Sequence, residues 1–177
     1  MASQTHFIHV FVILFVSLNL FSLHMVSADQ QLVTKVCEEN TIEDTEGCLK
    51  ILSPQASKAN NINQLVEVSM KQGAEVAQKT LTAVEELKKK PTSPAALTAL
   101  QICTEVYSNC VDEFKIVGPE LRDDPMSANY DVAIISPEIK RCVDALETAR
   151  FNAPELVQGN LDLYHYAALG YEMTVNL

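Results

Sequence analysis

Residues 93–119 read SPAALTALQICTEVYSNCVDEFKIVGP, and this stretch decides the predicted fold. Ser93 and Pro94 are typical of an N-cap and a first helical residue, and Gly118 with Pro119 is a stop signal. Between them, apolar residues recur with an alternating spacing of four and three, which is typical of a helix that packs along a bundle seam. These residues are Ala96, Leu100, Cys103, Tyr107, Cys110, Phe114 and Val117. The stretch predicts one amphipathic helix that ends at Gly118-Pro119.

Three other segments of the chain carry apolar stripes with helical spacing. The first runs from about residue 62 to 87 and is followed by three lysines and Pro91, which suit a helix C-terminus. The stripes are Ile62, Leu65, Val66, Ser69, Gly73, Val76, Ala77, Leu81, Val84 and Leu87; Ile135, Ile139, Cys142, Leu146 and Ala149; and Val157, Leu161, Tyr164, Ala168, Tyr171 and Val175. The sequence therefore predicts four amphipathic helices.

The connections between these segments are short. Residues 121–126 (LRDDPM) are read as an acidic connection, and Asn152-Ala153-Pro154 is a further stop and start signal. Pro137 interrupts the third stripe, so either Ser136 caps a new helix or a longer helix from about Ser127 kinks there. Four amphipathic helices joined by short connections can bury their stripes only against one another, which predicts an all-α, up-and-down four-helix bundle.

The N-terminal 28 residues differ from the rest of the chain. They contain no Asp, Glu, Lys or Arg, are mainly apolar from Phe7 to Leu23, and end in Val26-Ser27-Ala28. This pattern predicts a secretory signal peptide over residues 1–28, with cleavage between Ala28 and Asp29. The alternative is an uncleaved signal anchor, because the apolar stretch approaches the length that spans a bilayer. After cleavage, residues 29–177 form the expected mature domain, without stable membrane association.

The whole chain has 177 residues, with 13 basic and 23 acidic side chains, and a formal net charge of −10. This charge excludes a basic nucleic-acid-binding protein. The composition, 47% hydrophobic and 20% charged, can bury a core.

Five cysteines in a secreted chain predict two disulfides and one free thiol. Cys103 and Cys110 lie seven residues apart on one predicted helix, about 10.5 Å along its axis, so they cannot bond to each other. Cys142, on another helix, can face either of them. Cys37 and Cys48 can bond only if the residues between them form a helical hairpin, because a single helix would hold them about 16 Å apart.

The cysteine pattern resembles the plant invertase and pectin methylesterase inhibitors. The resemblance rests on VCEENTIEDTEGCLKIL around Cys37 and Cys48, on CTEVYSNCVDEF from Cys103, and on KRCVDALE around Cys142. It implies an N-terminal α-helical hairpin before the four-helix bundle. It also implies disulfides that join Cys37 to Cys48 and Cys103 to Cys142, which leaves Cys110 as the free thiol. We expect Cys110 to be a small buried apolar residue on the bundle seam; the alternative is a redox or intermolecular thiol, which requires an exposed cysteine with a lowered pKa.

The sequence offers little catalytic chemistry. His165 is the only histidine after residue 28, no phosphate-binding or nucleophile motif occurs, and Glu120, Asp123 and Asp124 lack the spacing of a calcium loop. We therefore expect no enzyme activity, no catalytic residue, no cofactor and no metal site. We expect this chain to act by binding.

The resemblance implies a one-to-one complex with a plant cell-wall or vacuolar carbohydrate enzyme whose substrate cleft is covered. Invertase inhibitors of this family often carry Pro-Lys-Phe in the connection before the fourth cysteine, whereas this chain has Pro125-Met126-Ser127. We therefore expect pectin methylesterase to be the target, and Asp123, Asp124, Pro125 and Met126 to be the candidate interface. An invertase target and a bundle that has lost inhibition are the alternatives; an enzyme or a small-lipid carrier is a remote one. We expect the protein to be secreted to the apoplast; the vacuole is the less favoured alternative.

Overall fold

The computed structural model describes residues 28–38, 44–90, 92–175 and 177. The leader predicted over residues 1–28 lies outside this part of the chain, apart from Ala28, at which the first described helix begins. The described elements are α2 (Ala28–Cys37), α3 (Thr45–Leu52), the 3-10 helix η1 (Ser53–Lys58), α4 (Ile62–Lys88), α5 (Pro94–Asp123), α6 (Pro125–Thr148) and α7 (Pro154–Thr174).

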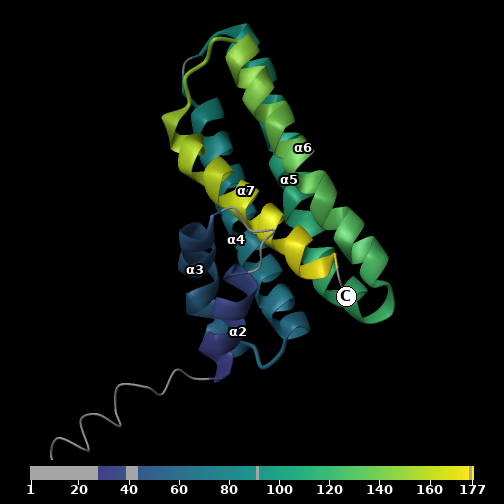
Figure 1. Ribbon diagram of the computed structural model, residues 1–177. Helices are drawn as coiled ribbons and strands as arrows, with labels where there is room; N and C mark the ends of the chain where they lie inside the picture. Colours follow the sequence, from purple (N-terminus) through teal and green to yellow (C-terminus); the bar gives the residue numbers. More distant parts are fainter. Residues whose placement is uncertain (1–27, 39–43, 91, 176) are drawn as a thin grey trace, which may run out of the picture.

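Helices α4 to α7 form the predicted four-helix bundle (Figure 1). Each of the four packs against two others, in the pairs α4 with α5, α5 with α6, α6 with α7, and α7 with α4. Consecutive helices run in opposite directions because the connections between them are short. The all-α, up-and-down bundle is therefore confirmed.

The N-terminal hairpin is formed by α2 and α3, and α3 lies beside α7 (Figure 1). A disulfide between Cys37 and Cys48 joins the two helices, with a Cα–Cα separation of 5.6 Å. Asp44 caps α3, because its Oδ1 accepts a hydrogen bond of 2.9 Å from the backbone N–H of Gly47. Helix α3 packs against α7, and η1, which follows α3, packs against α4, so the N-terminal segment contacts two helices of the bundle.

The second disulfide joins α5 to α6 through Cys103 and Cys142, whose Cα atoms are 4.6 Å apart. Both pairings are those that the family resemblance implies. Cys110 is a free, fully buried cysteine. Burial raises the pKa of its thiol to about 12, so the thiol stays protonated and packs as a small apolar group.

The predicted stripes of α5 and α6 lie in the core, as do most residues of the α4 stripe. All seven stripe residues of α5 are buried, and Tyr107 and Phe114 are among the largest buried side chains. On α6, Ile135, Ile139 and Cys142 are fully buried. The helical spacing of apolar residues therefore predicts the inward face correctly for α4, α5 and α6.

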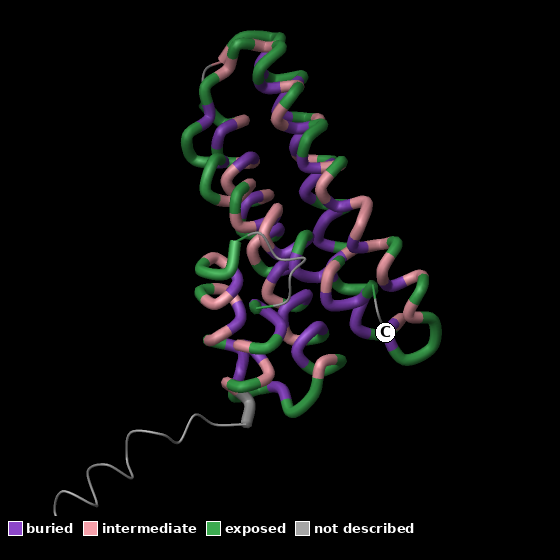
Figure 2. Tube along the Cα trace, viewed as in Figure 1, coloured by how far each residue is buried: buried purple, intermediate pink, exposed green. Residues whose placement is uncertain are grey.

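The predicted stripe of α7 is wrong, because it lies on the outer face of the helix. Of its six residues only Tyr164 is partly buried, whereas Val157, Leu161, Ala168, Tyr171 and Val175 are exposed. Figure 2 shows both buried and exposed residues along α7. The buried face instead carries Leu156, Leu163, Tyr166, Ala167, Leu169, Gly170, Met173 and Thr174. Its packing depends on glycine: a Cβ on Gly159 would lie 2.3 Å from Thr80 Oγ1, and one on Gly170 would lie 2.7 Å from Met70. Small residues on this face let α7 approach α4 closely.

Two prolines lie inside helices. The predicted end of α5 at Gly118-Pro119 is wrong, because the helix continues for another turn to Asp123. Leu121, one turn beyond Val117, is buried, which favours continuation of the helix. Pro119 has no N–H to donate to the carbonyl of Lys115, but Lys115 is exposed, so water can supply that hydrogen bond. Pro137 likewise lies inside one continuous helix α6, so no new helix begins at Ser136.

Within the described ranges, no helix combines the length and the apolar character that a membrane crossing requires.

Candidate functional site

The turn between α5 and α6 consists of Asp124 alone. The acidic connection predicted over residues 121–126 is mostly helical: Leu121 to Asp123 end α5, and Pro125 and Met126 begin α6. Asp124 caps α6, with its Oδ2 accepting from Ser127 Oγ at 2.8 Å and its Oδ1 accepting from the Ser127 backbone N–H at 3.2 Å. These bonds lower the pKa of the Asp124 carboxyl, which therefore stays charged at the tip of the helix pair.

The same tip presents apolar side chains to solvent. Met126 is 82% exposed, and Tyr130, one turn further along α6, is 65% exposed. Asp123 and Asp124 are exposed beside them, and Pro125 is partly exposed. The candidate interface of Asp123 to Met126 is thus an accessible, mixed acidic and apolar surface. Sequence reasoning missed Tyr130, although its spacing of four from Met126 places it on the same face of α6.

Acidic side chains line the contact between α5 and α6. Glu113 and Glu120 lie seven residues apart on α5, and Asp131 and Glu138 lie seven apart on α6. Within each cross-helix pair, Glu120 with Asp131 and Glu113 with Glu138, the residue on α6 lies three positions farther from the turn residue Asp124 than the residue on α5, so both pairs share one register. We call these four residues the carboxylate ladder.

The members of the carboxylate ladder act on each other electrostatically. The pKa of Glu120 is raised, first by burial and then by hydrogen bonding with Asp131 and by the charge of Asp131. The Oε2 atom of Glu120 is shielded from solvent and has no hydrogen-bond partner among the described residues. The pKa of Glu113 is also raised, by burial and then by Asp131, Asp112 and Glu138. The ladder therefore gathers four acidic side chains along the α5–α6 contact, and of these Glu138 forms an ion pair with Arg141, with 2.6 Å between Oε2 and Nη1.

Beneath this surface, a buried polar contact ties α5 to α7. The hydroxyl of Tyr107 donates a hydrogen bond of 2.5 Å to Oδ1 of Asn160 and lies 3.3 Å from Sγ of Cys142. Burial raises the pKa of Tyr107, so the hydroxyl keeps its proton. Because Cys142 is bonded to Cys103, this contact and the disulfide join three of the four bundle helices.

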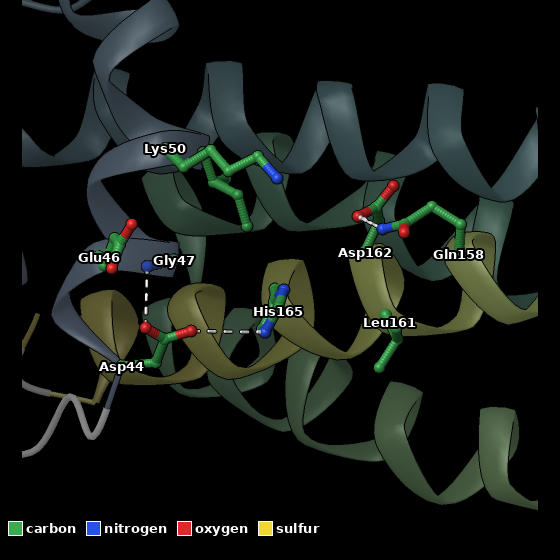
Figure 3. Close-up of a pocket in the computed structure, with 9 residues that line it drawn as sticks. Asp44, Glu46, Gly47, Lys50, Gln158, Leu161, Asp162 and His165 are labelled. Atoms are coloured by element: carbon green, nitrogen blue, oxygen red, sulfur yellow. Dashed lines mark hydrogen bonds and ion pairs between the residues drawn. The ribbon is translucent and has the colours of Figure 1, made fainter.

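A pocket of about 310 Å³ lies between α3 and α7 (Figure 3). His165 Nε2 lies 3.8 Å from Asp44 Oδ2, across the contact between hairpin and bundle. The remaining lining residues are Glu46, Gly47, Lys50, Ile51, Gln158, Leu161 and Asp162. The Asp162 carboxylate accepts a hydrogen bond of 2.7 Å from the Gln158 amide. The pocket is lined mainly by polar groups and unlike the apolar cavity that a lipid carrier needs.

The described residues offer no metal site: they contain no group of three or more His, Cys, Asp or Glu side chains arranged to hold a metal ion. Ser93 caps the N-terminus of α5, and Asp124 caps that of α6. The surface features that remain for recognition are the α5–α6 tip with its carboxylate ladder, the α3–α7 pocket, and the outer face of α7.

The comparisons with known proteins agree with this architecture. A family model described as plant invertase/pectin methylesterase inhibitor matches residues 31–172. The fold is similar to a mutant form of a pectin methylesterase inhibitor from Arabidopsis, with a TM-score of 0.71 and 16% identity over 82% of this chain and 96% of that chain. It is also similar to a pectin methylesterase inhibitor from Arabidopsis thaliana, with a TM-score of 0.61 and 16% identity over 83% of this chain and 96% of that one.

No curated protein matches the chain. At 16% identity the solved structures show a shared fold, and the family model, which spans most of the sequence, shows kinship. The chain belongs to the plant invertase/pectin methylesterase inhibitor family.

Proposed function

We propose that this protein is a secreted inhibitor that forms a one-to-one complex with a pectin methylesterase and blocks its substrate cleft. The observation that carries the proposal, beside family membership, is the carboxylate ladder next to the exposed tip of α5 and α6. An acidic surface with a protruding apolar residue complements a basic enzyme surface: the charge accelerates encounter, and burial of Met126 and Tyr130 slows dissociation.

Secretion is part of the proposal. The chain contains two disulfides, which persist in oxidising compartments, and residues 1–28 have the uncharged, mainly apolar composition from which a signal peptide is predicted. We infer that the mature protein starts at Asp29 and acts in the apoplast, where basic wall enzymes are its targets.

Invertase is the second candidate target, and one observation favours it. Pro125 is retained at the place of the Pro-Lys-Phe motif, where it begins α6 directly after the exposed turn. The lysine and the phenylalanine are absent, since Met126 and Ser127 follow. A methionine supplies apolar contact without the cation, so recognition that depends on the positive charge would fail with this chain.

Parallel titrations distinguish the targets. Purified pectin methylesterase and purified cell-wall invertase are each titrated with the protein at pH 5 to 6, and residual activity is measured. The proposal expects inhibition of the methylesterase with an end point at one equivalent. Inhibition of the invertase alone would assign the second target, and inhibition of neither would show a bundle that has lost this function.

Charge variants test the role of the ladder. Glu113→Gln with Asp131→Asn removes two ladder carboxylates while keeping side-chain size and leaving the Glu138–Arg141 ion pair in place, and Glu75→Gln, on an exposed position of α4, is the control. We expect the double variant to weaken inhibition about two- to tenfold, with a smaller salt dependence, because rim charges act mainly on the association rate. Equal inhibition by the double variant and the control would contradict a role for the ladder.

A further inference from the structure

The sulfur atoms of the described chain differ sharply in their access to solvent. All five cysteines are buried, and four of them are held in the two disulfides. Of the methionines in the described ranges, Met70 is 1% exposed and Met173 is 5% exposed, whereas Met126 is 82% exposed. The thioether of Met126 is therefore the one accessible methionine sulfur in this part of the chain.

Packing protects the two buried thioethers. Met70 lies on α4 and Met173 on the inward face of α7, and both belong to the hydrophobic core. The sulfur of Met70 lies so close to Gly170 that a Cβ on that glycine would be 2.7 Å from it. An oxidant in solution can reach either sulfur only when the bundle opens, because native cores leave few voids larger than a water molecule.

The position of Met126 is fixed by the turn before it. Pro125 is the first residue of α6, and Met126 is the second. Asp124 caps the helix through hydrogen bonds of 2.8 and 3.2 Å to Ser127, the residue after Met126. The backbone at Met126 is thus part of a capped helical turn, and its side chain extends into solvent at the α5–α6 tip.

We propose that Met126 is a site of reversible oxidation by peroxides, and that its conversion to methionine sulfoxide weakens binding of the target enzyme. The second half rests on the proposed function, in which the α5–α6 tip contacts the methylesterase. The site follows from exposure alone: Met126 is oxidised while the disulfides, Cys110 and the two core methionines are shielded.

The reaction transfers one oxygen atom and two electrons. The thioether sulfur attacks one oxygen of hydrogen peroxide, the O–O bond breaks as the S–O bond forms, and hydroxide leaves. The hydroxide takes the proton from the new S–OH group, so the products are the sulfoxide and water. The sulfur is oxidised and the peroxide is reduced. Methionine sulfoxide reductases, which use a thiol reductant, reverse the change, so the modification can act as a switch.

Oxidation changes the surface that the tip offers to a partner. It replaces an apolar, flexible side chain with a polar one whose oxygen requires a hydrogen-bond donor when it is buried. In the free protein water supplies that donor, so the fold is unaffected. In a complex the sulfoxide loses its water and adds partial negative charge beside Asp123 and Asp124, which are also exposed at the tip. Tyr130 keeps its apolar surface, so binding is weakened rather than abolished.

Peptide mass mapping tests the site without any target enzyme. The mature protein is treated with hydrogen peroxide, and sulfoxide formation is followed at each methionine. We expect Met126 to react at least tenfold faster than Met70 and Met173 in the native protein, and all three to react at similar rates in denaturant. The urea midpoint of the protein oxidised at Met126 should equal that of the untreated protein. Equal native rates at the three positions would overturn the site.

Inhibition titrations test the effect on binding, after the peroxide has been removed. Oxidation of wild type should weaken inhibition of the methylesterase at least tenfold, and sulfoxide reductases should restore it. Met126→Leu has no thioether at the tip, so its inhibition before and after peroxide should be the same. Met173→Leu is the matched control: it exchanges a buried methionine for a side chain of similar volume and keeps Met126, so peroxide should affect it as it does wild type.

The outcomes separate the two proposals. Unchanged inhibition by wild type that is fully oxidised at Met126 would overturn the switch, as would an equal loss in Met126→Leu. Absence of inhibition by the untreated protein would overturn the proposed function and the switch together. The mapping experiment would still decide whether Met126 is the oxidised residue, because it requires no inhibition.

Discussion

The hydroxyl of Tyr107 on α5 donates a hydrogen bond of 2.5 Å to Oδ1 of Asn160 on α7, across the bundle core. The ring of Tyr107 is fully buried, and its oxygen also lies against the sulfur of Cys142. This contact satisfies two polar groups where water has little access and ties α7 to the disulfide-bonded α5–α6 pair.

Replacement of Tyr107 by phenylalanine should destabilise the bundle by about 1 to 2 kcal/mol, because it leaves the Asn160 oxygen without its donor. Urea unfolding followed by circular dichroism measures the loss. Tyr130→Phe is the matched control, since Tyr130 is largely exposed, and should change stability by less than about 0.5 kcal/mol. Equal effects of the two substitutions would show that the hydrogen bond contributes nothing.

Stability should rise as the pH falls from 7 towards 5. The folded-state pKa values of Glu113 and Glu120 are raised, so their contribution is fully present below the ordinary carboxyl range and is lost as the pH rises through the raised values. The lowered pKa of Asp124 acts oppositely, but only in more acidic solution. Urea midpoints at pH 7 and pH 5 measure the effect. Glu120→Gln should flatten the profile and Glu75→Gln should not; an unchanged profile in Glu120→Gln would count against the ladder.

The two disulfides should differ in their contributions to stability. Cys103 and Cys142 close a loop of 39 residues within the core, so replacing both with alanine should cost about 4 kcal/mol of unfolding free energy. The pair Cys37 and Cys48 closes only 11 residues, so its removal should cost about 3 kcal/mol and mainly loosen the hairpin. Peptide mapping without reduction should recover these two links. A link between Cys110 and Cys142 would contradict the structure.

Cys110 should be inert towards thiol reagents in the native protein. Its side chain is fully buried and its pKa is raised to about 12, so neither access nor a thiolate is available. Labelling with a maleimide should be absent under native conditions and should reach one thiol per chain in denaturant. Rapid native labelling would mean that the α5–α6 contact opens readily.

Much of the fold could be predicted from the sequence because a buried helix face has a period, and three of the four faces were found through it. The inward face of α7 was predicted wrongly because this helix is apolar on two faces. Its inward face contains Gly159 and Gly170, and the need for glycine there becomes clear only in the structure, where the two residues pack closely against Thr80 and Met70 of α4. Helix α5 continues past Pro119, where Leu121 is buried in the core. The Gly118-Pro119 pair in the sequence gives no indication of this burial.

The candidate site was predicted only in part. Asp123 to Met126 were identified from a motif position and do form an exposed tip. The carboxylate ladder was missed, because Glu120 and Asp131 become neighbours only when a one-residue turn fixes the register of α5 against α6. Pairing across helices depends on that register, which the positions of apolar residues within each helix do not reveal.

The most direct test of the account is an inhibition titration of a basic pectin methylesterase with the mature protein at pH 5 to 6 and low salt. The account predicts that activity falls linearly to a plateau at one equivalent, and that added salt weakens the inhibition. Full methylesterase activity at a tenfold molar excess of correctly disulfide-bonded protein would contradict it.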